Sequence, residues 1–162
     1  MTSIRSFIEE DIQQVTDLNW RHLRGRDGSR PPLLRHYFKR LFFQNPWLDE
    51  DLPSLVAEDG KGSIVGFFGT VPRLMSYKGK AIRVAFASNF VVDPDSRFLL
   101  VGAQLLRRFI SGPQDLSMGD SGNDISREMF VSLGGTTVPL YSLHWSRILK
   151  PSQYTLYAWS WL

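Results

Sequence analysis

The sequence predicts a domain that mixes α-helices with β-strands, and three observations support this fold class. An apolar, β-branched run that begins at Phe90 stops at Asp93-Pro94, and a helical pattern follows. Turn signals at 59–62 and 77–80 divide the middle of the chain into strands. Two segments near the N-terminus carry apolar residues at helical spacing. The 162 residues are enough for one domain with a single substantial core.

Composition restricts the function classes. Hydrophobic residues make up 43% and charged residues 22% of the chain, which is ordinary for a soluble globular protein. The absence of cysteine excludes disulfides, thiolate catalysis and cysteine-rich zinc sites. We expect a cytoplasmic location and no membrane partner, because the N-terminus lacks a signal-peptide core and no apolar run could span a bilayer. A net charge of +3 is too small to indicate a nucleic-acid partner.

The N-terminal part is predicted to form one strand and two helices. Alternating residues predict a strand over 3–8, and acidic residues at 9–11 begin a helix that runs to about Arg24. After a loop at 25–32, a second helix ends near Asn45, because Pro46 disfavours helical geometry before it. The residues expected on the inward faces are Ile12, Val15, Leu18 and Trp20 or His22, then Leu34, Tyr37, Phe38, Leu41 and Phe42.

The central part is predicted to form hairpins. An acidic connector at 47–53 leads to the turn signal Asp59-Gly60-Lys61-Gly62. Pro72 is expected to interrupt the following strand or to place it at a sheet edge. The turn at 77–80 then leads into a longer strand. The predicted strands are 55–58, 64–69, 81–92 and, in short form, 116–119.

The stretch from Phe90 to Leu106 joins a strand to a helix through a tight loop. The first N–H groups of a helix lack partners within it and the helix dipole is positive there, so the end of this loop suits a phosphate. Gly102 removes a side chain where a ligand would approach the backbone. An ordinary strand–loop–helix crossover with a chance glycine is the alternative. The residues predicted on the apolar face of the helix are Leu99, Ala103, Leu106 and Ile110.

A second segment runs from Asn123 to Gly135. Ile125, Met129 and Leu133 are spaced by four, which predicts a short amphipathic helix that ends at a glycine cap. Taken alone, this segment is also what a core helix with a glycine cap looks like.

The two segments together resemble the coenzyme motifs of the GCN5-related N-acetyltransferases, the GNAT superfamily. They occur in the expected order within a resemblance that covers roughly residues 3–145. The residues that match motif A, V-x-P-x-x-R/Q-x-x-G-x-G/A and the leucines after it, are Val92, Pro94, Arg97, Gly102, Leu105 and Leu106. The residues that match motif B, N-x-x-A-x-x-L-Y-x-x-x-G-F, are Asn123, Ser126, Met129 and Gly134.

Three positions depart from the family pattern. Leu100 stands where the family usually has glycine, and its branched side chain restricts φ and crowds a phosphate. Phe130 replaces the motif-B tyrosine, and Gly135 replaces an aromatic residue. These departures leave open a degenerate GNAT domain that binds coenzyme or a partner without significant catalysis.

The resemblance implies an α/β (α+β) fold with a mostly antiparallel central sheet, flanked by helices and splayed at a parallel pair of strands around acetyl-CoA. The implied domain covers 1–150. The implied activity is transfer of an acetyl group from acetyl-CoA to a small-molecule or peptide amine by direct attack. The implied coenzyme-binding residues are Phe90, Val91, Val92, Arg97, Phe98, Leu99, Leu100, Val101, Gly102, Ala103, Asn123 and Phe130.

The sequence offers few candidate residues for a general acid or a general base. In the family a backbone N–H of the strand before the loop, here 90–92, polarises the thioester carbonyl, and the motif-B tyrosine is commonly the acid. The strand over 81–92 offers Arg83, Ser88 and Asn89 but neither carboxylate nor histidine as a general base. Glu58 is a further carboxylate of the sheet, or simply a charge at a strand end.

The catalytic candidates that remain are Tyr141 and His144, in the strand expected after motif B. A lone histidine between Leu143 and Trp145 is more often structural. The three histidines are scattered along the chain, so neither a Ser-His-Asp set nor a metal site is expected.

Basic residues gather between Arg21 and Arg40, opposed by Asp27 alone. In relatives this region walls the acceptor side of the cleft, so Arg24, Arg26 and Arg30 are expected there. The charge favours an acidic acceptor, such as a carboxylated sugar, a phosphorylated metabolite or an acidic protein segment. A solvated helix face is the alternative.

The C-terminal tail, 151–162, continues past the resemblance. Apolar and aromatic residues occur on both faces of a predicted strand that ends at Trp161-Leu162. We expect this tail to dock on a second subunit, as in a homodimer, or on a further domain if the chain is a fragment. A final strand that closes the domain's own sheet is the alternative.

Overall fold

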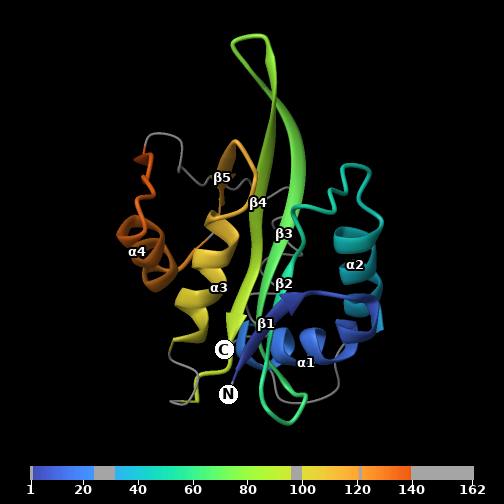
Figure 1. Ribbon diagram of the computed structural model, residues 1–162. Helices are drawn as coiled ribbons and strands as arrows, with labels where there is room; N and C mark the ends of the chain where they lie inside the picture. The colour runs from blue at the N-terminus through green and yellow to red at the C-terminus, as the bar shows by residue number, and fades with distance from the viewer. Residues whose placement is uncertain (1, 24–31, 96–99, 121, 140–162) are drawn as a thin grey trace, which may run out of the picture.

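We describe the protein from a computed structural model, in which residues 2–23, 32–95, 100–120 and 122–139 are described (Figure 1). The tail and the acceptor-side arginines lie outside them. In chain order the elements are β1 (Ser3–Ser6), η1 (Glu9–Asp11), α1 (Ile12–Leu23), α2 (Pro32–Phe43), β2 (Leu55–Glu58), β3 (Ile64–Tyr77), β4 (Lys80–Val92), α3 (Val101–Ile110), β5 (Leu116–Met118) and α4 (Asp124–Ser132).

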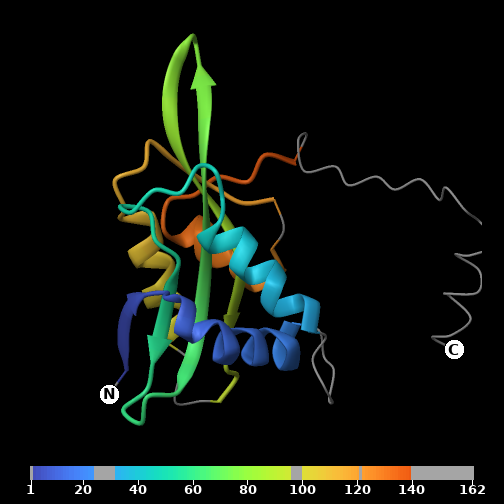
Figure 2. The same ribbon diagram turned by 90° about the vertical axis from the view of Figure 1, so that its right-hand side faces the viewer.

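A five-stranded sheet in the order β1-β2-β3-β4-β5 forms the middle of the molecule. The first three pairings are antiparallel and the β4–β5 pairing is parallel. Helices α1 and α2 cover one face of the sheet, and α3 and α4 lie on the other (Figures 1 and 2). This arrangement confirms the predicted mixed fold with one parallel pair.

The core under α1 and α2 is aromatic. Phe38, Phe42 and Phe67 are buried against one another, with ring centroids 5.3 to 5.8 Å apart. The predicted faces of the two helices are confirmed at most positions. Tyr37 was wrongly included, because it lies at the margin of the apolar stripe and stays half exposed. His22 is exposed as well, whereas Trp20 is partly buried.

The core on the other face is built around α3. The predicted apolar face of this helix was wrong at Ala103, which is exposed, and Leu99 lies outside the described residues. The buried residues are Val101, Gly102, Leu105, Leu106 and Phe109. Gly66 of β3 explains the difference: a Cβ atom there would lie 2.9 Å from both Val101 and Leu105. The helix face is therefore fixed by the shape of the sheet beneath it.

Helix α4 packs less than its pattern predicted. Ile125 and Leu133 are 70% and 40% exposed, so the expected apolar stripe was wrong at both ends. Only the adjacent pair Met129 and Phe130 packs on the α3 core. Gly134 has φ +92°, which confirms the glycine cap.

The two predicted turns are confirmed. The Asp59 carboxylate accepts hydrogen bonds from the N–H groups of Lys61 and Ser63, which closes the β2–β3 turn. At the β3–β4 turn, Lys78 and Gly79 have φ +51° and +77°, the left-handed pair that a two-residue hairpin favours.

Pro72 does not interrupt its strand, contrary to the prediction: β3 runs on to Tyr77. The N–H and C=O groups of Thr70 bond the Ser54 hydroxyl and so face the β2 edge. Pro72, two residues on, turns its nitrogen to the same edge. Because β2 pairs with β3 only as far as Phe68, no ladder bond is lost there.

Arg5 ties the first strand to the start of the helices. Its guanidinium donates to both Asp11 oxygens, at 2.6 and 2.9 Å, and to Glu58 at 2.8 Å. Burial alone would raise the pKa of the Asp11 carboxyl, but the Arg5 hydrogen bonds, the Ile8 N–H and the Arg5 charge together hold that pKa below its usual value.

Asp11→Asn is therefore expected to lower the free energy of unfolding at pH 7 by about 1 to 3 kcal/mol. A lowered pKa stabilises the fold above the ordinary value near 3.8 and loses that contribution as the pH falls further. The difference between wild type and variant should thus shrink below that pH. Urea unfolding at pH 7 and pH 3 measures this, and an equal difference at both would contradict the role given to the carboxylate.

Candidate coenzyme and acceptor site

Strand β4 contains a bulge. Phe67 pairs with Val91 and Gly69 with Ser88, so a step of two residues in β3 faces a step of three in β4. Asn89 lies within the extra segment and has φ +53°. Asparagine tolerates this left-handed conformation better than most residues. The bulge breaks the ladder between β3 and β4 and redirects the end of β4.

Side chains from α1 hold the bulge in place. Asn19, only 1% exposed on α1, donates from Nδ2 to Asn89 Oδ1 at 3.2 Å. Asn89 Nδ2 in turn donates to Ser88 Oγ at 2.9 Å. The three polar side chains thus satisfy one another on the α1 face of the sheet, and the buried Asn19 has its partner.

Gly69 makes room for the bulge from the β3 side. A Cβ atom at this position would lie 2.4 Å from the Ser88 carbonyl oxygen and 2.7 to 2.8 Å from the Phe42 ring. Backbone cannot move aside as a flexible side-chain tip can. Only glycine therefore fits between the bulge and α2.

The parallel strands separate just before the bulge. Strand β5 pairs with β4 from Val84 to Phe86. Beyond that point, from Ala87 to Val92, no strand in the described part of the chain pairs with this edge of β4. The edge presents backbone N–H and C=O groups that an extended ligand can bind.

The N-terminus of α3 follows the end of β4. Asp93 donates its N–H to the Val65 carbonyl at 2.8 Å, and its carboxylate accepts the Asp95 N–H at 3.0 Å, which starts the loop. Leu100 is the N-cap, with φ −87° and 73% exposure. A negative φ is ordinary for leucine, so its restricted backbone causes no strain at this motif position.

Gly102 has a different surrounding from the one expected. It is buried, and a Cβ atom there would lie 3.4 to 3.6 Å from Phe90, Met129 and Val92. These are ordinary contact distances to side chains of β4 and α4. The glycine thus serves close packing of three elements, and the expected opening for a ligand beside its Cα was wrong.

The motif-B residues of α4 lie beside α3. Asn123 caps the helix, since its Oδ1 accepts the Ser126 N–H at 2.9 Å. The partly buried Phe130 ring meets the Phe109 ring edge-on, with centroids 6.3 Å apart.

The structure brings some predicted residues together and leaves others apart. Phe90, Val92 and Gly102 meet beside Met129, whereas Val91 is buried on the opposite face, in the α1–α2 core. The predicted residues that lie outside the described part of the chain are Arg97, Phe98, Leu99, Tyr141, His144, Arg24, Arg26 and Arg30.

Two charged candidates are engaged in ion pairs. Arg83 binds Asp49 through two of its nitrogens, at 2.7 to 2.9 Å, and reaches Asp51 at 3.2 Å. Glu58 binds Arg5, so it is neither free nor simply solvated.

Sequence reasoning missed the β4 bulge and the residues that accommodate it, which are Asn19, Gly69 and Asn89. Two signals were present: glycine inside a strand often marks a bulge or a close backbone approach, and asparagine is depleted from strands.

Solved structures share this fold. Comparison by sequence finds no matching family profile and no similar curated protein. By fold, the chain is similar to glucosamine-6-phosphate N-acetyltransferase from Arabidopsis thaliana, with a TM-score of 0.65 and 16% identity over 93% of this chain and 99% of that one. A predicted acetyltransferase from Clostridium acetobutylicum, solved with acetyl-CoA, gives 0.65 and 17% over 91% and 96%. A transcriptional regulator from Bacillus halodurans gives 0.66 and 17% over 93% and 100%.

These likenesses show that the chain has the fold of the GNAT acetyltransferases, as the sequence resemblance implied. Within the described residues, no helix has the length and apolar character to cross a membrane. Nor do His, Asp and Glu side chains of that part come together in a set of three suited to a metal ion.

Two glycine substitutions test the geometry around β4. Gly69→Ala is expected to lower the free energy of unfolding by about 1 to 3 kcal/mol, because the new methyl group meets a backbone carbonyl. Gly102→Ala is the control: its methyl group fits at contact distance within a helix, where alanine is favoured over glycine by about 0.5 to 1 kcal/mol. Urea unfolding should give opposite signs, and equal losses would contradict the bulge geometry.

Proposed function

We propose that the protein is a cytoplasmic N-acetyltransferase that moves an acetyl group from acetyl-CoA to an amine by direct attack within a ternary complex. The observation that carries the proposal is the conjunction of a bulge in β4, a β4 edge that no described strand pairs beyond Phe86, and the N-terminus of α3. Together they offer hydrogen-bond donors to a chain-like ligand and to a phosphate at its end.

The described residues fit the coenzyme through their backbone. The N–H groups of Val101, Gly102 and Ala103 have no earlier helical turn to bond, so they would hold the pyrophosphate together with the loop from Arg97 to Leu100. The β4 edge from Phe90 to Val92 would orient the thioester carbonyl. Asn123 and Phe130 would flank the coenzyme from α4. When bound, acetyl-CoA supplies an activated acetyl group.

Proton transfer is the part of the reaction with least support. The polar groups that the structure places at the bulge are Asn19, Ser88 and Asn89, whose side chains do not titrate near neutral pH. Tyr141 and His144 stay our candidates for acid and base. Water can otherwise accept the amine proton and protonate the thiolate, at some cost in rate.

The solved structures of similar fold support acetyl transfer to an amine. One carries the name glucosamine-6-phosphate N-acetyltransferase, and another was solved with acetyl-CoA. At 16 to 17% identity they leave the acceptor of this chain undetermined.

A degenerate domain that binds coenzyme without significant catalysis is the second candidate. The observation that favours it is Phe130, whose ring packs against Phe109 and has no hydroxyl to donate. A thioester-cleavage assay over a panel of amines, amino sugars and peptides separates the two candidates, because only the enzyme releases coenzyme A in an acceptor-dependent way.

Acetyl-CoA is expected to raise the melting temperature of the wild type, since a ligand that binds only the folded state contributes about 2.7 kcal/mol at a hundred times its Kd. Asn89→Gly should keep most of this shift, because glycine adopts positive φ freely, although the hydrogen bond from Asn19 is lost. Asn89→Val should weaken it, because a β-branched residue disfavours the bulge conformation. Calorimetry that detects no binding at millimolar coenzyme would refute the proposal.

Phe130→Tyr is expected to raise turnover, because a positioned acid for the leaving thiolate is worth about a hundredfold. Steady-state kinetics with the best amine of the panel measures the change, and calorimetry checks that coenzyme affinity is preserved. Turnover that stays at the wild-type level would assign Phe130 to packing alone.

A further inference from the structure

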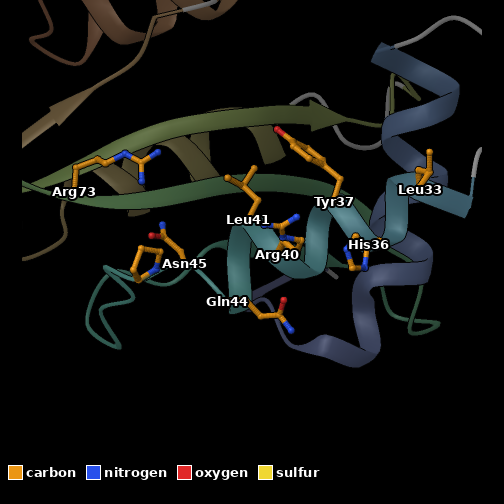
Figure 3. Close-up of a pocket in the computed structure, with 9 residues that line it drawn as sticks. Leu33, His36, Tyr37, Arg40, Leu41, Gln44, Asn45 and Arg73 are labelled. Carbon is orange, nitrogen blue, oxygen red and sulfur yellow. The ribbon is translucent and has the colours of Figure 1, made fainter.

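A groove of about 500 Å³ lies between α2 and β3 on the α1–α2 face of the sheet (Figure 3). Its apolar walls include Tyr37 and Leu41 of α2. This volume lies in the usual range of small-molecule sites, about 300 to 1,000 Å³, which commonly combine apolar walls with a few polar groups.

The polar groups of the groove are guanidinium, imidazole and amide groups and the Tyr37 hydroxyl. Arg40 and His36 come from α2 and Arg73 from β3, and none of the described residues that line the groove is a carboxylate. The Arg73 guanidinium lies 4.9 Å from the centre of the Trp47 ring, which holds it at the wall. In the described part of the chain, no carboxylate forms an ion pair with Arg40 or Arg73.

Asn45 provides an independent sign of a ligand. This residue is 8% exposed, and its Oδ1 accepts the Trp47 N–H at 3.0 Å. Its Nδ2 is buried without a hydrogen-bond partner among the described residues, and Figure 3 shows the amide turned toward the side of Arg73. A buried donor without a partner is costly, so an acceptor atom of a ligand would satisfy it.

Both walls of the groove lead along their elements toward the β4 bulge. The Phe42 ring contacts the Gly69 position opposite Ser88. Leu41 precedes Phe42 on α2, and Asn45 follows the end of that helix by two residues. On β3, Arg73 follows Gly69 by four residues, about 13 Å along the strand. A small molecule held by the groove can therefore extend toward the bulge.

We propose that this groove binds the anionic group, a phosphate or a carboxylate, of the amine acceptor. The guanidinium groups of Arg40 and Arg73 neutralise the anion, and Asn45 Nδ2 donates a hydrogen bond to one of its oxygens. The apolar walls pack against the body of the acceptor. This inference rests on the proposed function, because an acceptor held in the groove by its anionic group would present its amine toward the bulge.

The test measures affinity by calorimetry in 0.1 M salt for three matched amino sugars. Glucosamine 6-phosphate carries a phosphate, muramic acid carries a carboxylate, and glucosamine carries neither. Wild type is expected to bind at least one of the anionic sugars about tenfold or more tightly than glucosamine, the effect of one charge-assisted hydrogen bond. Which anionic sugar binds better identifies the anion.

Substitutions then locate the binding. Arg40→Gln is expected to remove about tenfold of the affinity for the anionic sugar. Arg35→Gln is the matched control, because Arg35 is an exposed arginine of the same helix that does not line the groove. Asn45→Asp keeps an oxygen for the Trp47 N–H but replaces the unpartnered donor with a charge that repels the anion, so binding should be lost. Melting temperatures confirm that each variant is folded.

Two outcomes overturn the inference: equal affinity for all three sugars, or equal affinity of Arg40→Gln and Arg35→Gln for the anionic sugar. Acetyl-CoA titrations on the same proteins separate this failure from that of the proposed function. If the protein binds coenzyme but does not discriminate among the sugars, only the proposed anion binding by the groove is refuted. Discrimination without coenzyme binding refutes the acetyltransferase and leaves an anion-binding groove.

Discussion

The close approach of the Ser88 carbonyl to Gly69 is the constraint on which the rest of the site depends. Without a side chain at Gly69 the extra residue of β4 can be accommodated, and the Asn19–Asn89 hydrogen bond then fixes it against α1. The bulge lies where β4 has left β5, and no strand of the described residues pairs with that edge of β4. The absence of a Cβ atom at Gly69 thereby allows Phe42 of α2 and the β4 bulge to pack on the same position of β3.

The two faces of the sheet differ in how they are packed. The α3 face is closely packed around Gly66 and Gly102 and presents a helix N-terminus beside the end of β4. The α2 face is aromatic in its core but carries an open, cationic groove at its margin. Strand β3 borders both, since Gly66 lies under α3 and Arg73 lines the groove. On the proposed function, coenzyme and acceptor would approach the neighbouring β4 bulge from opposite sides.

Local chemistry explains which parts of the fold could be predicted from the sequence. The Asp59 turn, the Lys78-Gly79 turn and the Gly134 cap depend on a few neighbouring residues, and all three were predicted correctly. The faces of α3 and α4 depend on the shape of what they pack against, so spacing alone misplaced them. Pro72 is tolerated only because β2 is short, and a bulge is defined by the register of two strands, which no single segment encodes.

The contrast between backbone features and side-chain features also explains which parts of such a site can persist at low sequence identity. Backbone N–H groups bind phosphate and carbonyl whatever the residue, and Leu100 has an ordinary negative φ at a position where the motif that it resembles usually has glycine. A coenzyme held mainly by backbone can thus survive extensive substitution. An acceptor is chosen by side chains, and in our proposal these are Arg40, Arg73 and Asn45, whose Nδ2 has no hydrogen-bond partner among the described residues. The specificity of the proposed enzyme is therefore to be sought in its own groove rather than in the names of structures that share its fold.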